Sequence, residues 1–192
     1  MRSRITCSLV GDAMVGKSRL LASFLGQNII DLYAPTVFST LKGIMKVGEK
    51  QLKVKFVDTA GQQEYSRLRA FSYKKSDVFI LCFSAIDRLS FERIRSLWIP
   101  ELERNVGKKV PIFLVATHKD LKYDANVKKC TCIVSTSEGE RLAAEIKAEG
   151  YFEVNTVDYC CARKIFECAM CGVLSNRKGC FRTLKKYFSS RH

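Results

Sequence analysis

Gly11-Asp12-Ala13-Met14-Val15-Gly16-Lys17-Ser18 follows an apolar run at Ile5–Val10 and opens a segment with helical spacing of apolar residues at Lys17–Leu25. This stretch decides the fold, because it fits the pattern G-x-x-x-x-G-K-[S/T] in the strand–loop–helix context that a phosphate loop requires. Backbone N–H groups and the helix N-terminus of such a loop bind phosphate oxygens. Lys17 adds a positive charge for the β- and γ-phosphates, and Ser18 offers a hydroxyl to Mg²⁺. The whole stretch is therefore the predicted phosphate-binding site.

A second motif, Asp58-Thr59-Ala60-Gly61-Gln62, follows another predicted strand. An acid at a strand end can hold Mg²⁺ through water, so Asp58 joins Ser18 as a candidate metal ligand. The N–H of Gly61 can turn toward a γ-phosphate, and the amide of Gln62 can orient an attacking water molecule. The two motifs together predict nucleoside triphosphate hydrolysis, with Lys17 and Gln62 in catalytic roles.

Strands alternate with helices along the rest of the chain. The further predicted strands are Leu41–Val47, Gln51–Val57, Val78–Phe83, Ile112–Ala116 and Tyr151–Val154. The further predicted helices are Ser90–Val106, Ser137–Ala148 and Ala162–Leu174. This order predicts an α/β fold with a doubly wound, mostly parallel six-stranded sheet, one antiparallel strand, and helices on both faces.

Length and composition suit one packed domain with a charged tail. The chain has 192 residues, of which 47% are hydrophobic, and we expect the domain to occupy residues 1–175. The sequence shows no apolar run long enough for a membrane span and no signal-peptide pattern, so we expect a cytoplasmic protein. Residues 163–192 contain eight Lys or Arg and one Glu, half of the formal charge of +14. This charge predicts an anionic partner, either a membrane or nucleic acid.

Nine cysteines are an odd number for a disulfide-bonded secreted scaffold. Cys7 and Cys82 lie in predicted buried strands, where a thiol behaves as a small apolar side chain. Cys168 and Cys171 have C-x-x-C spacing, but no second pair of ligands completes a zinc site. Reduced thiols are therefore the favoured interpretation.

The two motifs and the segment between them resemble the small GTPases, a class of P-loop NTPases. Four further stretches resemble the Rho/Rac branch: Pro35-Thr36-Val37-Phe38, Tyr65-Ser66-Arg67-Leu68-Arg69, Leu81-Cys82-Phe83-Ser84 and Trp98-Ile99-Pro100-Glu101. The resemblance implies a monomeric switch that binds GTP or GDP with Mg²⁺ and hydrolyses GTP. It implies that Thr36 binds Mg²⁺ and senses the γ-phosphate.

The resemblance also implies partners: effector kinases and scaffolds that act on actin, cell polarity and membrane traffic, exchange factors, and GTPase-activating proteins. The implied effector and switch residues are Tyr33, Pro35, Val37, Phe38, Tyr65, Arg67 and Leu68.

Ala13 departs from the family, which usually has a second glycine there. Its methyl group would crowd Gln62 and an incoming arginine finger, which predicts slow hydrolysis and a bias to the GTP state.

The implied guanine site departs further from the family. Its residues are Ile29, Thr117, His118, Asp120, Thr156 and Val157. Asp120 keeps a carboxylate that accepts two hydrogen bonds from guanine, but His118 replaces a lysine and either stacks on the base or faces solvent. Ile29 replaces a phenylalanine, and Val157 replaces a lysine. Several weakened contacts of about 1 kcal/mol each predict fast nucleotide exchange.

The segment Leu121–Cys130 is shorter than the insert helix of Rho relatives, and the sequence leaves open whether it is helical.

The predicted tail, residues 176–192, ends without a C-a-a-X box, so no prenyl group is expected. Its apolar residues cluster on one side of a helical wheel, opposite Arg182, Lys185 and Lys186. The tail either binds the plasma membrane or an endomembrane, with Cys180 as a palmitoylation candidate, or is solvated or packed on its own domain. Nucleic acid is disfavoured, because no recognition motif accompanies the charge.

A different class of function is the main alternative. A pseudo-GTPase adaptor would bind nucleotide weakly and act as a constitutive scaffold. Ala13 and the altered base site favour this alternative, whereas the intact Lys17, Ser18, Thr36 and Gln62 oppose it. A metabolic P-loop kinase fits poorly, because the sequence shows no acceptor-binding lid.

Overall fold

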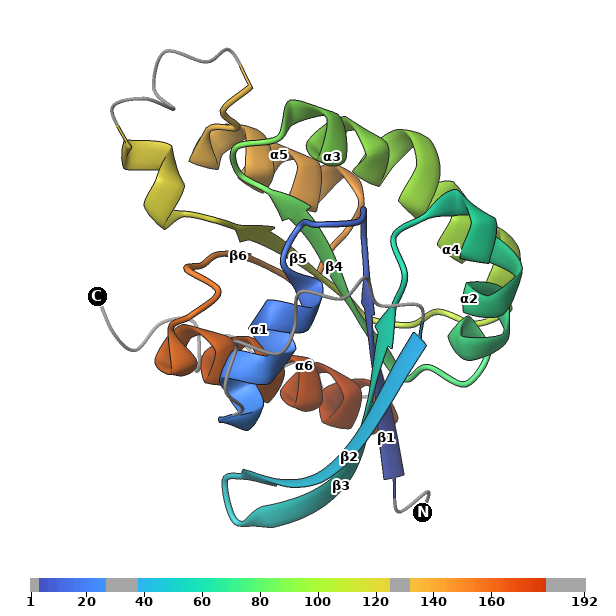
Figure 1. The fold of residues 1–192 in the computed structure, drawn as a ribbon. Coiled ribbons are helices and arrows are strands. Elements are labelled where there is room, and N and C mark those ends of the chain that lie inside the picture. The colour runs from blue at the N-terminus through green and yellow to red at the C-terminus, as the bar shows by residue number, and fades with distance from the viewer. Residues whose placement is uncertain (1–3, 27–37, 125–131, 179–192) are drawn as a thin grey trace.

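The computed structural model describes residues 4–26, 38–124 and 132–178, and Figure 1 shows one central sheet in this part of the chain. The strand order is β2-β3-β1-β4-β5-β6, with β2 antiparallel to β3 and the other neighbours parallel. The strands are β1 (Arg4–Val10), β2 (Phe38–Val47), β3 (Lys50–Thr59), β4 (Val78–Ser84), β5 (Ile112–Thr117) and β6 (Gly150–Glu153). The predicted doubly wound α/β fold is confirmed.

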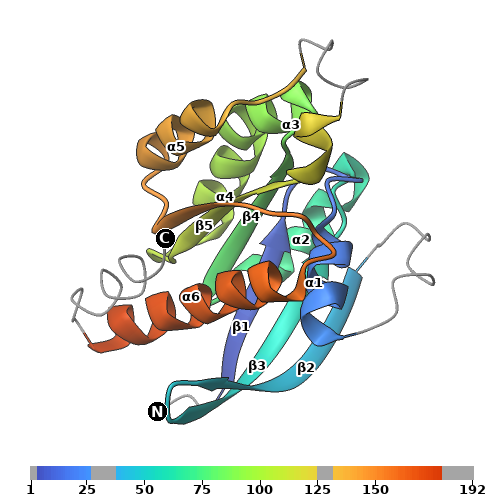
Figure 2. The same cartoon turned by 90° about the vertical axis from the view of Figure 1, so that its left-hand side faces the viewer.

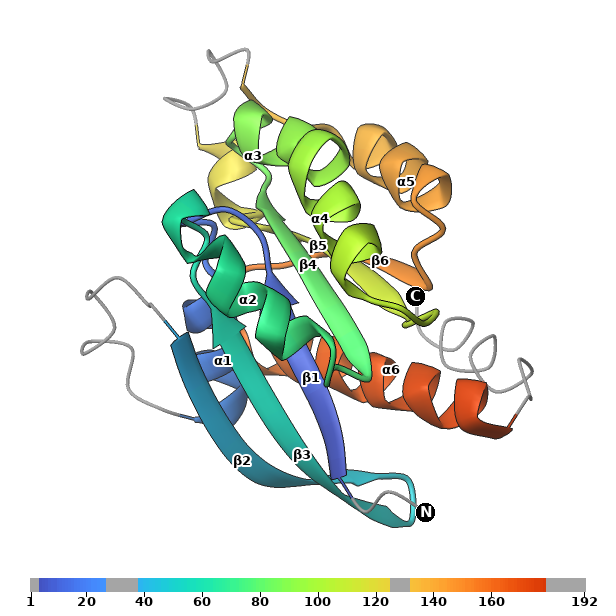
Figure 3. The same ribbon diagram turned by 90° about the vertical axis from the view of Figure 1, so that its right-hand side faces the viewer.

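Helices cover both faces of the sheet, as Figures 2 and 3 show from opposite sides. The helices are α1 (Lys17–Leu25), α2 (Ser66–Tyr73), α3 (Arg88–Arg93), α4 (Ile99–Asn105), α5 (Thr136–Glu145) and α6 (Tyr159–Lys178). One core packs α1 and α6 against the sheet, and the other packs α2 to α5 against the opposite face. None of the described helices combines the length and the apolar character needed to cross a membrane.

Three phenylalanines hold α1 and α6 to the sheet. The ring of Phe166 lies 4.4 Å from that of Phe24 and 5.4 Å from that of Phe56, measured between centroids. The pair from α6 and β3 is nearly perpendicular, an arrangement that aromatic rings favour. This cluster fixes the helix that begins at the phosphate loop.

The segment predicted as a helix at Ser90–Val106 is helical from Arg88 to Asn105, but it is not uniform. One turn of π-helix, Ile94–Trp98, separates α3 from α4. Pro100 follows this turn and has no N–H to donate, which interrupts the α-helical ladder there. Asp87 begins the helix by accepting hydrogen bonds from the N–H groups of Leu89 and Ser90.

The predicted end of α5 at Ala148 is wrong, because the helix stops at Glu145. Lys147 has a φ of 55°, in the left-handed region. Its N–H donates to the Ala144 carbonyl, and the N–H of Ala148 donates to the Ala143 carbonyl. This pair of bonds is a Schellman motif, which usually carries glycine at the left-handed position. Because this position is a lysine, the sequence did not indicate where the helix ends.

Other elements were absent from the prediction. The helix α2 and the 3₁₀ turns Gln63–Tyr65 and Asp120–Tyr123 follow no clear apolar period. The turn Asp120–Tyr123 covers the start of the segment Leu121–Cys130, for which the sequence left helix formation open. Residues 125–131 lie outside the described part of the chain. The helix α6 continues through residue 175 to Lys178. Residues 179–192 are not described, so the tail and Cys180 stay predictions.

The described cysteines are all free thiols. Cys7 and Cys82 are buried in neighbouring strands, and burial raises the pKa of Cys82 to about 12. Cys168 and Cys171 lie on the buried side of α6, within the core that also contains Phe166. These four thiols pack as apolar side chains.

Phe166→Ala should lower the free energy of unfolding by about 3–5 kcal/mol, because it leaves a cavity between α1, α6 and β3. Urea denaturation followed by circular dichroism measures this loss. Phe71→Ala is the matched control, since Phe71 is 73% exposed and should change stability little. Equal losses for the two variants would contradict the role of the aromatic cluster.

Candidate phosphate-binding site

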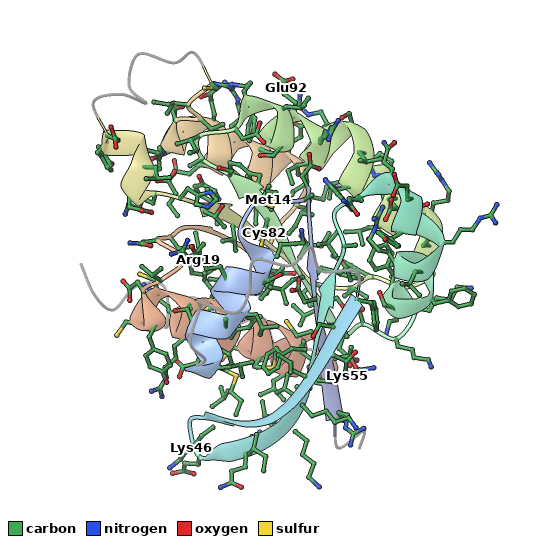
Figure 4. The ribbon with its side chains drawn as sticks, in the orientation of Figure 1. Met14, Arg19, Lys46, Lys55, Cys82 and Glu92 are labelled. Carbon is green, nitrogen blue, oxygen red and sulfur yellow. The ribbon has the colours of Figure 1, made fainter. Side chains whose placement is uncertain are left out.

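The loop between β1 and α1 needs its two glycines for different reasons. A β-carbon at Gly11 would lie 2.1 Å from the carbonyl oxygen of Cys82 in β4, so no other side chain fits. Gly16 has a φ of 86° and caps α1 without a side-chain cap, which leaves backbone N–H groups of the first helical turn for an anion. Met14 is 87% exposed at the tip of the loop, and Figure 4 shows it above Cys82.

Lys17 points back into the loop that it follows. Its ammonium donates to the carbonyls of Gly11 at 2.9 Å and Asp12 at 2.6 Å. Burial lowers the pKa of Lys17, while the negative charge of Asp58 opposes this effect. A phosphate bound in the loop would therefore interact strongly with this desolvated side chain.

Ser18 and Asp58 lie in direct contact, as expected for two ligands of one ion. The Ser18 hydroxyl donates to Oδ2 of Asp58. The other oxygen, Oδ1, is buried and has no hydrogen-bond partner in the described part of the chain. Burial raises the pKa of Asp58, and the bond from Ser18 opposes that shift. A buried acceptor without a donor fits a Mg²⁺ site, because hard cations prefer oxygen ligands.

The second predicted motif packs against the phosphate loop at Gly61. A β-carbon there would lie 2.0 Å from the backbone nitrogen of Ala13 and 2.1 Å from the carbonyl carbon of Asp12. The backbones of the two motifs thus touch, which only glycine permits. Gln62 follows with an exposed side chain, and Ala13 is also exposed.

The side chain of Asp12 faces away from the open side of the loop. It is 7% exposed, and its Oδ1 accepts from the indole Nε1 of Trp98 at 2.7 Å. Its Oδ2 pairs with Arg93 at 2.9 Å. Two side chains of the helix that contains the π turn therefore bind the Asp12 carboxylate. The positive charge of Arg93 offsets its negative charge, which would otherwise repel a phosphate.

The same tryptophan also contacts a cation. The guanidinium of Arg69, in α2, lies 4.8 Å from the centre of the Trp98 ring. Arg69 also donates to the backbone carbonyls of Ala60 at 2.9 Å and Gln62 at 2.5 Å. It forms a two-pronged ion pair with Glu101, at 2.9 Å for each bond. Trp98 thus connects the phosphate loop with the segment that contains Gly61.

The predicted base-binding residue Thr117 supports the phosphate loop. Its hydroxyl lies 2.7 Å from the carbonyl of Val15 and 3.0 Å from that of Phe83, and the residue is fully buried. This hydroxyl ties the loop to the end of β4.

His118 lies against the phosphate loop and is half-buried, so its side chain does not simply face solvent. Its backbone has a φ of 56°, and its Nδ1 lies 2.9 Å from the Ser84 hydroxyl. Burial lowers the pKa of His118, and the charge of Asp120 opposes this effect. A β-carbon at Gly16 would lie 3.5 Å from Nε2 of His118 and 3.2 Å from Cγ2 of Thr156. The two predicted base-binding segments therefore meet at the start of α1.

The remaining predicted site residues have different placements. Asp120 and Val157 are exposed, and the Val157 N–H is already bonded to the Asn155 side chain. Ile29, Tyr33, Pro35, Thr36 and Val37 lie outside the described residues. The described switch residues Phe38, Arg67 and Leu68 are exposed, and Tyr65 is half-buried.

Sequence reasoning missed the residues that support the site. Asp12 was predicted as a phosphate contact, and Arg69, Arg93 and Trp98 had no assigned function. The available signal was compositional: a tryptophan and charged side chains at buried positions need polar partners. The identity of those partners could not be predicted from spacing.

The chain matches a protein-family model. The model described as the Ras family matches residues 6–174. The match includes the phosphate loop, the Asp58–Gln62 motif and both base-binding segments.

Trp98→Phe should lower the free energy of unfolding by about 1–3 kcal/mol, because it leaves a buried Asp12 oxygen without its donor. Urea denaturation measures the loss. A double-mutant cycle with Asp12→Ala should show a coupling of about 0.5 kcal/mol or more. Strict additivity would contradict the contact.

His118 should make the fold less stable as the solution becomes acidic. Because its folded pKa is below the unfolded value, the unfolded state takes up the proton first as pH falls below about 6.5. Stability should therefore fall more steeply from pH 7 to pH 5 in the wild type than in His118→Asn, measured by urea denaturation. Asparagine tolerates the left-handed backbone and keeps an acceptor for Ser84. Identical pH profiles would contradict the shifted pKa.

Proposed function

The chain belongs to the Ras family of small GTPases, and from this premise we propose that it is a Rho-type switch that hydrolyses GTP slowly. The observation that best supports this proposal is the contact of Gly61 with the Asp12–Ala13 peptide. Two motifs that are far apart in sequence share one surface at the phosphate site. A γ-phosphate bound at this contact would change the position of the Gly61 segment, which is the event that a switch needs.

The chemistry follows from the described side chains. Lys17 and the N–H groups at the start of α1 would bind phosphate oxygens. Ser18 and, through water, Asp58 would hold Mg²⁺, with Thr36 as a further proposed ligand. The ion would supply positive charge that stabilises the transferred phosphoryl group. Gln62 would orient the attacking water from its exposed position beside Gly61.

Slow hydrolysis is proposed because of Ala13. A β-carbon added at Gly61 would lie 2.0 Å from the Ala13 backbone nitrogen, so Ala13 is next to the segment that contains Gln62. A fixed methyl group restricts the space in which Gln62 and an arginine finger would stabilise the transition state. The GTP-bound state would then be the major state in the cell.

Fast exchange is proposed because of the base side. His118 is bonded to Ser84 and packed near Gly16, while Val157 is 45% exposed. Neither provides the long aliphatic stem with which a lysine covers the base. Asp120 remains available for guanine recognition.

The output would pass through α2. Arg69 holds the Ala60 and Gln62 carbonyls, so a shift of this segment would move the exposed apolar side chains of Leu68 and Phe71. We expect effector kinases and scaffolds of actin, polarity and membrane traffic to bind this surface together with the Tyr33–Phe38 segment. Exchange factors and activating proteins would act at the same switches. Association of the basic tail with a membrane belongs to the same proposal.

A constitutive adaptor is the second candidate function. It is favoured by the Ser18–Asp58 and Lys17–carbonyl contacts, which pair the Ser18 hydroxyl and the Lys17 ammonium within the protein. In that case nucleotide would bind weakly and would not control the switch surface.

Three measurements test the proposal. Protein purified with Mg²⁺ should contain guanine nucleotide, mostly GTP, and the emission of the single tryptophan should differ between GTP and GDP. In single-turnover hydrolysis, Ala13→Gly should be about tenfold faster than the wild type. Gln62→Leu should be slower, and Gln63→Leu is its exposed control.

The outcomes separate the two candidates. Equal rates for the wild type and Ala13→Gly would remove the proposed cause of slow hydrolysis. An empty site together with undetectable binding of added GTP would reject the switch and support the adaptor.

A further inference from the structure

One face of the β2–β3–β1 part of the sheet is unusually basic. In β2, Met45 and Val47 are buried in the core, so the alternating residues Lys42, Ile44 and Lys46 point to the opposite face. In Figure 3 the lower part of this face has no helix in front of it, while α6 lies behind. Figure 4 shows Lys46 near the hairpin end and Lys55 farther along the sheet.

The neighbouring strands add cations to the same face. In β3, Val54 and Phe56 are core residues, so Lys53 and Lys55 alternate to the basic side. Lys42 lies opposite Lys55, and Ile44 lies opposite Lys53. Arg4 of β1 pairs in register with Lys53. We call Arg4, Lys42, Lys46, Lys53 and Lys55 the basic face.

The basic face has no internal charge balance. None of its five cations takes part in the ion pairs of the described residues, which all lie elsewhere. Lys42 and Lys55 stand directly opposite each other, with β-carbons about 5 Å apart, an arrangement that weakens strand pairing. A neutral polar residue at either position would remove the repulsion.

Protection of a sheet edge explains part of this charge. Lysines on an edge strand block pairing with other chains, and β2 is an edge strand. This reason covers Lys42 and Lys46. It does not cover Lys53 and Lys55, because β3 is paired on both sides at these positions. Arg4 precedes the part of β1 that pairs with β4.

The centre of the basic face is apolar. Ile44 is 70% exposed and lies between Lys42 and Lys46 on its own strand. An exposed apolar side chain within a ring of cations matches an anionic surface that has a hydrocarbon interior. Nucleic acid and an acidic peptide match the charge but give no apolar layer for Ile44.

The basic carboxyl-terminal segment leaves from the same end of the molecule. The helix α6 packs against β1 and β2 and ends at Lys178, near the start of β1, as Figures 2 and 3 show. The residues that follow include Arg182, Lys185 and Lys186. Stable membrane attachment takes two signals, and these basic residues are the predicted second one.

We propose that the basic face is a membrane-docking surface of the folded domain, which binds an anionic lipid leaflet with Ile44 in the headgroup layer. This surface is separate from the nucleotide site and does not depend on the proposed switch function. Each cation near an anionic leaflet strengthens binding by about fivefold, and the effect falls within a Debye length.

The test uses the full chain and sedimentation with phosphatidylcholine vesicles that contain about 30% phosphatidylserine, compared with pure phosphatidylcholine. Lys42→Gln/Lys53→Gln/Lys55→Gln should weaken binding to the anionic vesicles by about tenfold or more. The matched control, Lys108→Gln/Lys109→Gln/Arg141→Gln, removes the same charge from exposed positions outside this face and should change binding less than about threefold. Circular dichroism checks that all variants fold.

Two further variants define the contact. Ile44→Ser should weaken binding to anionic vesicles without altering the charge. Arg182→Gln/Lys185→Gln/Lys186→Gln measures the tail, and the loss caused by the basic-face variant should persist in this background. Equal losses for the basic-face and control triples would overturn the proposal, because net charge alone would then explain binding. Loss of binding to single-stranded DNA with unchanged vesicle binding would also overturn it.

Discussion

The carboxylate of Asp12 has both of its oxygens bound by one helix, and the shape of the phosphate loop depends on this contact. An acid within a phosphate loop would repel its ligand if its charge faced the open side. Trp98 and Arg93 hold it on the far side at 2.7 Å and 2.9 Å. The backbone of the loop is then free to present its N–H groups and Lys17 to an anion, while the acid fixes the loop to the sheet's helical layer.

Trp98 makes this contact part of a larger unit. Its indole N–H binds Asp12, and its ring face carries the guanidinium of Arg69, whose other bonds hold the Ala60 and Gln62 carbonyls. Arg69 also forms a buried ion pair with Glu101. This pair offsets the free-energy cost of burying the guanidinium charge. The π turn Ile94–Trp98 lies at the centre of the unit, in keeping with the frequent presence of such turns at functional sites. The position of the Gly61 segment is therefore coupled to the phosphate loop by side chains as well as by direct backbone contact.

The sequence predicted the strand–loop–helix unit and the Asp58–Gln62 motif because each is a local pattern with fixed spacing. It predicted six strands, of which β4 and β5 were recognisable as continuous apolar runs because they are buried on both faces. It did not predict α2, whose buried residues Arg69 and Tyr73 are polar or amphipathic, and it extended α5 because Lys147 takes the place usual for glycine. The sequence also indicated two base-binding segments, a role that stays a prediction. It could not show that Thr117 turns its hydroxyl inward or that His118 has a left-handed backbone.

What the sequence by itself determined was the fold class, the phosphate loop and the Ras-family membership, because backbone conformation in short motifs depends on neighbouring residues. What only the tertiary structure decided was which side chains support the site and which faces stay open. Asp12 and its partners are 81 and 86 residues apart, and Arg69 and Glu101 are 32 apart. The cations of the basic face come from three strands that meet through register. Such contacts depend on strand order and helix packing, which are properties of the whole chain.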